Sequence, residues 1–472
     1  MQQIISIVEQ ISAVVWGPFI LMPLLLGTGI YILFGMRCLQ VRQLGAALKQ
    51  MYQSITHKGE EGEISPFEAL MTGLAGTIGT GNIVGVATAI FIGGPGAVFW
   101  MWVTGFLGMG VKYCEALLAV KYREVTPDGS YVGGPMYYIK NGLGQKWMPL
   151  AIFFAVAGAI ASFGIGNMTQ ANAIATNVVA AFNLETISLG STTIPGTWFI
   201  AVVLFFAASA VIVGGVKRIG RVAGLVVPFM ALAYIFLGIY AMIIHWEVVP
   251  KIFGLIFSNA FSLESVAGGG VGTVLRKTIQ LGMARGMFSN EAGMGSSPIA
   301  HATTTETNPV KQGYLGMIDP LLDTLLVCTV TAMIILISGE WAMAPEGMSS
   351  GAMQGTLTAR SFAALFPHFG ELFVAGALFF FAFTTLMAWS VYGDRCVRFL
   401  LGDKWSVPYR MAFCIIIPVG ALTELEFAWA FADLFNGLMA IPNLIALIFL
   451  APVVFKMTSD FLAEEEKRKR IK

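Results

Sequence analysis

Residues 71–96 read MTGLAGTIGTGNIVGVATAIFIGGPG, and this stretch decides the fold. It is long and apolar enough to cross a bilayer, yet it carries Gly73, Gly76, Gly79, Gly81 and Gly85. Glycine weakens a helix interior, and irregular backbone at membrane depth is tolerated only where it lines a cavity or is buried in protein. The stretch therefore predicts a membrane helix that is interrupted midway.

A second stretch, residues 280–298, reads QLGMARGMFSNEAGMGSSP and has the same character. Its glycines are joined by the polar residues Ser289, Asn290 and Glu291, which must find partners at membrane depth. Glycines can also simply allow helices to pack closely, and we favour that explanation for Gly105 and for Gly108 to Gly110. For GTGN and SNEAGMGSS we favour a functional break.

The composition places the whole chain in a membrane. Hydrophobic residues make up 56% of the 472 positions and charged residues only 12%, too few charges for the surface of a soluble protein of this length. The five cysteines show no metal-binding spacing, so we expect reduced, structural thiols. Runs of about 20 apolar residues predict eleven spans, at 14–34, 66–92, 96–120, 149–180, 197–214, 222–244, 272–300, 314–338, 370–392, 408–424 and 427–455.

The basic residues predict the orientation. If the N-terminus lies outside and the spans alternate, the Lys and Arg residues between spans fall on the inner side, except Lys251 and Arg360. This predicts a multi-pass protein of the cell membrane with a cytoplasmic C-terminus. The segments are then an extra N-terminal helix (1–40), a cytoplasmic linker (41–65), a first five-helix repeat (66–245), an outer loop (246–271), a second repeat (272–456) and a basic tail (457–472).

The two interrupted spans open the two five-helix halves. Five is an odd number, so the halves insert with opposite topology, and matching interrupted spans in inverted halves are typical of a transporter site. The predicted fold is thus all-α, a 5+5 inverted repeat with discontinuous first and sixth core helices plus one extra helix. A broken helix exposes N–H groups suited to a carboxylate and carbonyls suited to an ammonium or Na⁺, so an amino acid with a cation fits both ends.

Several strings together resemble one known family across nearly the whole chain. They are AGTIGTGNIVGVATA (75–89), GGPGAVFWMW (93–102), GGPMYY (133–138), GNMTQANA (166–173) and ARGMFSNEAGMGSSPIAHA (284–302). The sequence is similar to the alanine-or-glycine:cation symporters, the sodium:alanine symporter family of the amino acid–polyamine–cation superfamily. The resemblance implies the 5+5 fold, alanine or glycine as substrate, and Na⁺ as the coupling ion.

The resemblance also implies roles for single residues in the substrate site. The backbone of Thr80 and Gly81 receives the carboxylate, Asn82 supports it, and the Gln170 amide reaches the zwitterion. A plain helix–helix hydrogen bond is the alternative for Gln170. The remaining pocket residues come from the seventh span: Gly282, Met283, Gly286, Phe288 and Asn290.

The resemblance places the cation site on the second and ninth spans. The string FAFTTLMAWSVYGDR (381–395) contains adjacent hydroxyls. The implied Na⁺ ligands are the hydroxyls of Thr384 and Thr385 with the carbonyls of Ala75, Ile78 and Phe381. Hydroxyls in membrane helices also commonly bond their own i−4 carbonyl. Trp389, one turn further on, is assigned to the pocket wall, with an interfacial anchor as the alternative.

Charged residues within the spans need partners. Lys112 and Glu115 are three residues apart and can pair, and Asp319 and Asp323 can share a helix face. One such acid could carry a coupling proton.

The predicted function is import of a small neutral amino acid with Na⁺ by alternating access, with membrane lipid as surroundings and no nucleic-acid partner. A proton-coupled or exchange transporter of another small amino acid is the nearer alternative. A channel or a transport-dead amino-acid sensor is the other. The four histidines are dispersed, and no phosphate-binding or nucleophile-elbow motif occurs, so no enzyme is expected.

Overall fold

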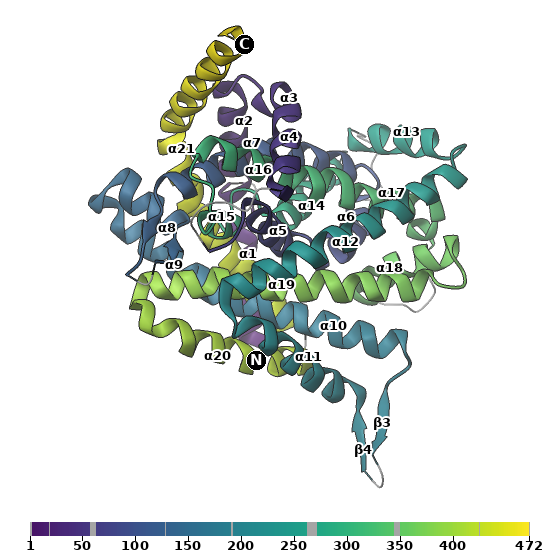
Figure 1. Ribbon diagram of the computed structural model, residues 1–472. Coiled ribbons are helices and arrows are strands. Elements are labelled where there is room, and N and C mark those ends of the chain that lie inside the picture. Colours follow the sequence, from purple (N-terminus) through teal and green to yellow (C-terminus); the bar gives the residue numbers. More distant parts are fainter. Residues whose placement is uncertain are drawn as a thin grey trace.

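The computed structural model describes residues 2–17, 19–56, 63–127, 129–189, 192–261, 271–343, 350–423 and 425–471, and these are almost entirely helical (Figure 1). Four helices precede the first predicted repeat: α1 (Gln2–Val15), α2 (Leu21–Gly35), α3 (Leu39–Arg42) and α4 (Leu44–Thr56). The predicted first span at 14–34 is therefore not one helix, because α1 ends at Val15 and α2 starts at Leu21.

The first predicted repeat is built from helices and two small antiparallel hairpins. Its helices are α5 (Pro66–Thr77), η1 (Gly81–Gly85), α6 (Val86–Gly93), α7 (Ala97–Lys121), α8 (Pro135–Tyr138), η2 (Ile139–Leu143), η3 (Gln145–Trp147), α9 (Met148–Phe163), η4 (Gly164–Met168), α10 (Thr169–Ala181), α11 (Gly196–Ile212) and α12 (Gly215–Ile244). The hairpins pair β1 (Glu124–Val125) with β2 (Tyr131–Val132) and β3 (Thr186–Leu189) with β4 (Thr192–Pro195).

The remaining elements form the second half of the chain. They are α13 (Val249–Ala260), α14 (Val271–Asn290), α15 (Ser297–Ala302), α16 (Pro309–Pro320), η5 (Leu321–Cys328), α17 (Thr329–Ser338), η6 (Glu340–Ala342), α18 (Ser350–Leu365), α19 (Gly370–Leu401), η7 (Asp403–Trp405), α20 (Ser406–Leu422) and α21 (Leu425–Ile471). The sequence patterns missed α13, which lies in the predicted outer loop, and α18, which lies between two predicted spans.

Seven of the described helical segments are long and apolar enough to cross a membrane. An eighth span arises if the bent pair 66–77 and 81–93 counts as one. The other predicted spans coincide with shorter or broken helices, so the structure shows a multi-pass membrane protein without confirming the count of eleven. The seven segments are Ala97–Lys121, Gln145–Ala181, Gly215–Ile244, Pro309–Ser338, Gly370–Leu401, Asp403–Leu422 and Asp433–Arg470.

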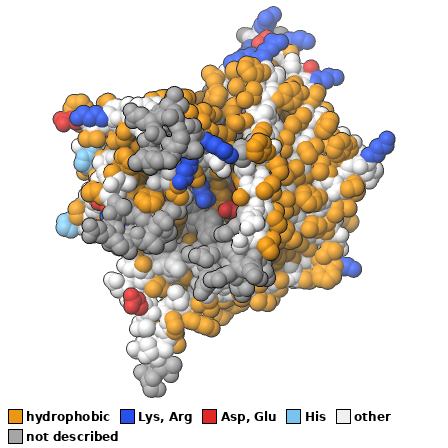
Figure 2. All heavy atoms as spheres, turned by 180° about the vertical axis from the view of Figure 1, so that it is seen from behind, with side chains coloured by type: hydrophobic (Ala, Val, Ile, Leu, Met, Phe, Trp, Pro, Cys, Tyr) orange, Lys and Arg blue, Asp and Glu red, His pale blue; other side chains and the backbone are white. Residues whose placement is uncertain are grey.

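The surface agrees with a lipid environment. Figure 2 shows a broad, continuous area of hydrophobic side chains on one face, with basic side chains concentrated at its upper end. Along α12, large apolar side chains point outward, among them Leu225, Phe229 and Phe236, which are 76%, 69% and 74% exposed. So large an apolar exposure is unstable in water and is expected where lipid tails surround a helix.

Several loops that were predicted on one side of the membrane meet in space. The Arg123 guanidinium donates hydrogen bonds to the carbonyls of Ala302 (3.2 Å), Thr304 (2.6 Å) and Glu306 (3.1 Å). Ile64 and Thr304 form a β-bridge. The loops that contain these residues therefore lie on the same face of the molecule, as expected if successive spans alternate in direction.

Candidate functional site

The first interrupted helix is broken where the glycines predicted. Helix α5 begins with a capping box, in which Ser65 and Glu68 satisfy each other's backbone N–H, and it ends at Thr77. A π-helical turn then starts at Gly81, and the two halves meet at an angle of 50°. The Asn82 side chain stabilises the break by accepting a hydrogen bond from the Gly79 N–H at 2.9 Å. Ile78 lies between the halves, so its carbonyl is outside the regular helix.

The second interrupted helix is also broken. Helix α14 ends at Asn290, and α15 starts only at Ser297. Three residues between them have positive φ: Glu291 at 53°, Gly293 at 88° and Gly295 at 81°. Positive φ is easy for glycine but strained for Glu291, and such strain is common at functional sites. The Asn290 side chain holds the turn, because it accepts a hydrogen bond from the Ala292 N–H at 2.9 Å.

Three of the predicted cation ligands, Ile78, Phe381 and Thr385, contact one another at the first break. The Thr385 hydroxyl donates to the carbonyls of Ile78 (3.3 Å) and Phe381 (2.9 Å), and the Thr384 hydroxyl donates to Phe381 (3.0 Å). Gly79 makes this approach possible, since a Cβ there would lie 2.6 Å from the Thr385 hydroxyl oxygen. Two carbonyls and two hydroxyls thus converge, which is an oxygen set that suits a hard cation.

The i−4 hydrogen bonds that we weighed against a cation role are present as well. Thr384 donates to the Phe380 carbonyl at 2.9 Å, and the bond from Thr385 to Phe381 also has this spacing. The fifth predicted ligand, Ala75, is fully buried near the C-terminal end of α5. Both hydroxyls therefore have local partners. Thr385 also bonds to Ile78 at the break, whereas Thr384 contacts the Met230 thioether of α12 at 3.7 Å.

Gln170 reaches the first break from α10. Its side-chain N–H₂ donates to the Ile165 carbonyl (3.0 Å) and to the Thr80 hydroxyl (3.4 Å), whereas its Oε1 is buried without a hydrogen-bond partner among the described residues. A buried, unpaired amide oxygen is costly unless a ligand satisfies it. Ile165 belongs to the π-helical turn η4, which the sequence patterns missed; such turns often mark functional sites.

The two breaks touch each other at Gly81. A Cβ on Gly81 would lie 3.2 Å from the Phe288 ring and 3.4 Å from the Ser289 Cα atom. Thr80, Phe288 and Met283 are all buried. Gly81, Thr80, Gln170 and Phe288 therefore belong to one buried region, as the substrate-site prediction requires.

Other predicted site residues hold the helices in place. Gly282 faces Ala97 and Trp100 of α7, and Gly286 faces Met101 and Thr104 of α7, so these glycines allow close helix packing. The Asn82 and Asn290 amides both reach η5.

The amide contacts connect each break to one acidic turn. The Asn82 Nδ2 donates to the Asp323 carboxylate at 2.6 Å, and the Asn290 Nδ2 donates to the Thr324 hydroxyl at 3.1 Å. Ser289 also donates to Asp323, at 2.9 Å. Sequence reasoning noted Asp323 as an intramembrane charge but found no partner, because its partners are far away along the chain.

Trp389 lies completely inside the protein, which excludes an interfacial anchor. Its indole N–H donates to the Glu291 carboxylate at 3.1 Å, and its side chain packs on Gly166 of η4. It thus connects α19, which carries the predicted cation ligands, to the second break.

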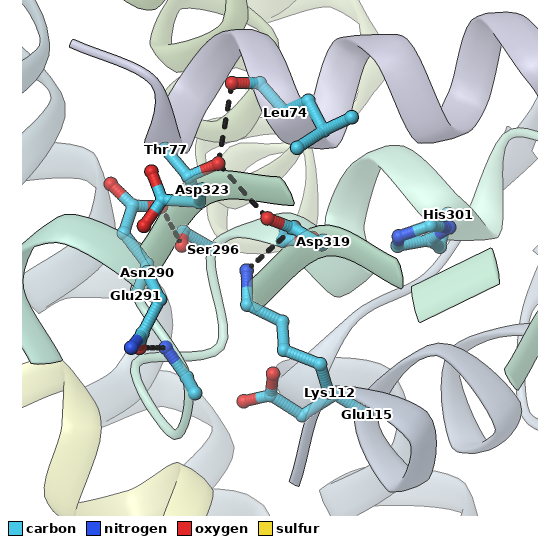
Figure 3. Close-up of polar contacts among 12 residues, drawn as sticks. Leu74, Thr77, Lys112, Glu115, Asn290, Glu291, Ser296, His301, Asp319 and Asp323 are labelled. Carbon is cyan, nitrogen blue, oxygen red and sulfur yellow. Dashed lines mark hydrogen bonds and ion pairs between the residues drawn. The ribbon is translucent and has the colours of Figure 1, made fainter. Parts of the chain in front are cut away.

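A buried ion pair connects both breaks (Figure 3). The Lys112 ammonium lies 3.0 Å from the Asp319 carboxylate. The sequence suggested Glu115 as its partner, and that prediction is wrong. Asp319 also accepts hydrogen bonds from Thr77 at the end of α5 (3.0 Å) and Ser297 at the start of α15 (3.1 Å). Glu115 instead accepts from the Gly293 N–H at 3.2 Å and Asn443 at 2.6 Å.

This architecture can be compared with known proteins. The family profile described as the sodium:alanine symporter family matches residues 1–472. The chain belongs to this family. It is 44% identical over 459 residues to the sodium/alanine symporter AgcS of Methanococcus maripaludis, covering 97% of each chain. It is 37% identical over 472 residues to the putative sodium/proton-dependent alanine carrier protein YrbD of Bacillus subtilis, covering 98% of this chain and 93% of that one.

Membership of the sodium:alanine symporter family identifies the chain as a membrane transporter and not an enzyme. The crystal structure of MhsT in complex with L-phenylalanine has a similar fold, with a TM-score of 0.55 at 14% identity over 85% of this chain and 99% of that one. This likeness concerns the fold alone. The inverted relation between residues 66–245 and 272–456 stays a prediction.

Proposed function

We propose that the protein imports a small neutral amino acid, alanine or glycine first, together with Na⁺ by alternating access in the cell membrane. The N-terminus would lie outside and the C-terminus in the cytoplasm. The observation that carries the proposal is the convergence of the Ile78 and Phe381 carbonyls with the Thr384 and Thr385 hydroxyls at the first helix break.

The substrate would lie directly beside that cation. Thr80 and Gly81 follow Ile78 within three residues, so a carboxylate at their backbone would be close to a cation at the Ile78 carbonyl. The Gln170 Oε1, which has no partner within the described ranges, would accept a hydrogen bond from the ammonium group. A zwitterion and a cation that share one buried site stabilise each other, which couples the binding of one to the binding of the other.

Close packing at the breaks favours a short side chain. Phe288 packs on Gly81 and Trp389 on Gly166, so large rings border the region on two sides. The driving force would come from the Na⁺ gradient and the membrane potential, which contributes about 2.3 kcal/mol per charge per 100 mV.

The test is uptake of labelled alanine into proteoliposomes with an inward Na⁺ gradient, compared with choline at the same pH. We expect accumulation only with Na⁺, with glycine and serine competing better than leucine or glutamine. Undiminished uptake in choline would refute Na⁺ coupling.

A proton-coupled transporter is the second candidate, because acids are buried next to the same breaks. In addition, the relative YrbD is named a putative sodium/proton-dependent alanine carrier protein. A pH gradient would then drive uptake in choline. A channel would instead show conductance far above carrier turnover, and a sensor would bind alanine without accumulating it.

A further inference from the structure

Four carboxyl groups and one ammonium group are buried around the second break. Glu115, Glu291, Asp319 and Asp323 are 0%, 3%, 0% and 0% exposed, and Lys112 is 1% exposed. Lys112 is bonded to Asp319, so its charge is balanced by one acid. Within the described part of the chain, neither Glu115 nor Glu291 forms an ion pair.

A carboxylate without a counter-ion in this position has an unfavourable free energy. Removing an ion from water costs several kcal/mol even after relaxation, and a buried acid without a counter-ion commonly takes up a proton instead. The hydrogen bonds of each acid indicate which of them can take up that proton, donate it to a neighbour and keep its other contacts.

The contacts of Glu115 and Asp323 favour the charged form. Glu115 accepts on Oε1 from the N–H groups of Gly293 and Asn443, and its buried Oε2 has no hydrogen-bond partner among the described residues, so a proton on Oε2 would find no acceptor. Asp323 accepts a hydrogen bond from Asn82 on Oδ1 and from the hydroxyls of Ser289 and Thr324 on Oδ2, so a proton on either oxygen would displace at least one donor. Three donors stabilise a carboxylate without any cation.

The contacts of Glu291 differ. Its Oε1 accepts from the Trp389 indole N–H at 3.1 Å, and its Oε2 contacts the Ser296 hydroxyl. A hydroxyl can accept as well as donate. A proton on Oε2 would therefore form a hydrogen bond to Ser296, while Oε1 kept its bond to Trp389. The neutral acid would therefore keep its hydrogen bonds to both Trp389 and Ser296.

The surroundings of Glu291 add negative charge. Lys112 faces it from α7, Asp319 from α16 and Tyr392 from α19, whereas Glu115 of α7 acts on Lys112. In Figure 3, His301 of α15 lies beyond Asp319 as seen from Glu291. Asp323 of η5 lies above Glu291 in the same view. Elsewhere in the second break, the groups that face Gly293 and Gly295 are uncharged: Leu25 of α2, Pro135 of α8, Phe154 of α9 and Asn443 of α21. Among the described residues, Lys112 is the cation that acts on Glu291, and it is bonded to Asp319.

We propose that the Glu291 carboxyl binds a proton from water when the second break closes around it, and that loss of this proton at high pH arrests transport. The proton sits on Oε2 and is donated to Ser296. Deprotonation keeps the Trp389 bond but leaves a buried charge without a counter-ion at the break. This charge disfavours the closed arrangement, in which Trp389 joins the carboxyl to α19, the helix of the predicted cation ligands.

The transport test rests on the proposed function and uses proteoliposomes at a series of pH values with a fixed Na⁺ gradient. Wild-type uptake should fall about tenfold per pH unit above a midpoint, as for one titrating group. Glu291→Gln imitates the neutral acid, since its oxygen accepts from Trp389 and its N–H₂ donates to Ser296, so its uptake should not fall at high pH. Glu115→Gln is the matched control and should keep the wild-type pH profile.

The outcomes separate the two proposals. No Na⁺-dependent uptake at any pH refutes the proposed function, whereas uptake with the same pH profile in wild type and Glu291→Gln refutes the proton site. Infrared spectroscopy on purified protein is independent of transport. The carbonyl band of a protonated carboxyl should be present in wild type at neutral pH, weaker in Glu291→Gln, and unchanged in Glu115→Gln. Absence of that band from wild type refutes the proposal even if a variant fails to fold.

Discussion

The Lys112 ammonium and the Asp319 carboxylate lie 3.0 Å apart in the interior of the protein, 1% and 0% exposed. Asp319 also holds Thr77 and Ser297, which lie next to the two helix breaks. This pair therefore joins α7 and α16 to the ends of both interrupted helices, so both breaks share one buried carboxylate.

Removing one partner of this pair should strongly destabilise the protein. Lys112→Met leaves Asp319 charged and without its cation, which typically costs 3–5 kcal/mol at a buried site. We expect a clearly lower thermal unfolding midpoint in detergent. The double variant Lys112→Met with Asp319→Asn should recover part of the loss, because no unpaired charge remains. Equal midpoints for wild type and Lys112→Met would contradict this account.

Thr385→Ala should weaken Na⁺ activation of uptake. It removes the hydroxyl that lies between Ile78 and Phe381, and a bond to a charged group is worth about 1.5–3 kcal/mol. The Na⁺ concentration for half-maximal uptake should rise roughly tenfold or more, with little change in the order of competing amino acids. Thr385→Ser keeps the hydroxyl and is the control. Unchanged Na⁺ dependence in Thr385→Ala would remove this residue from the cation site.

Gly79→Ala should impair the same site by crowding. The added Cβ would lie 2.6 Å from the Thr385 hydroxyl oxygen, so this side chain must move. Gly85→Ala, in the same break, meets nothing within 4 Å and provides the matched control. We expect Gly79→Ala to lose most Na⁺-driven uptake and Gly85→Ala to keep it, at equal expression. Similar uptake by both variants would show that the close contact between Gly79 and the Thr385 hydroxyl is unimportant for transport.

Gln170→Leu should reduce the affinity for alanine. The Gln170 amide oxygen is buried and has no hydrogen-bond partner in the described part of the chain, and leucine removes it at similar volume. The KM for alanine should rise about tenfold, which corresponds to one good hydrogen bond to a charged group, while half-maximal Na⁺ stays nearly constant when alanine is saturating. If the KM for alanine is unchanged, the amide serves only to join α10 to Thr80.

Trp389→Ala should relax selectivity by size. The side chain is completely buried, so its removal opens space beside Gly166 and the second break. Leucine should then compete with labelled alanine more strongly than in wild type. Trp389→Phe keeps most of the bulk, loses the bond to Glu291 and should remain selective. Unchanged competition by leucine in Trp389→Ala would exclude a wall role.

The sequence alone determined where the helices break and which transport family the chain belongs to. GTGN and SNEAGMGSS interrupt their helices because glycine and polar residues act on the backbone next to them, and this effect is local. The convergence of Ile78 with Thr385 also followed, once the family resemblance was taken into account.

Only the tertiary structure decided which side chains meet inside the bundle. Lys112 is bonded to Asp319, 207 positions away, and not to Glu115, and Gly282 and Gly286 face α7. Such contacts depend on how each helix is rotated against neighbours distant in the chain. A nearly uniform apolar sequence does not encode that rotation in its hydrophobic pattern, because lipid and protein surroundings are equally apolar. The close packing of small residues and the pairing of buried charges determine it instead.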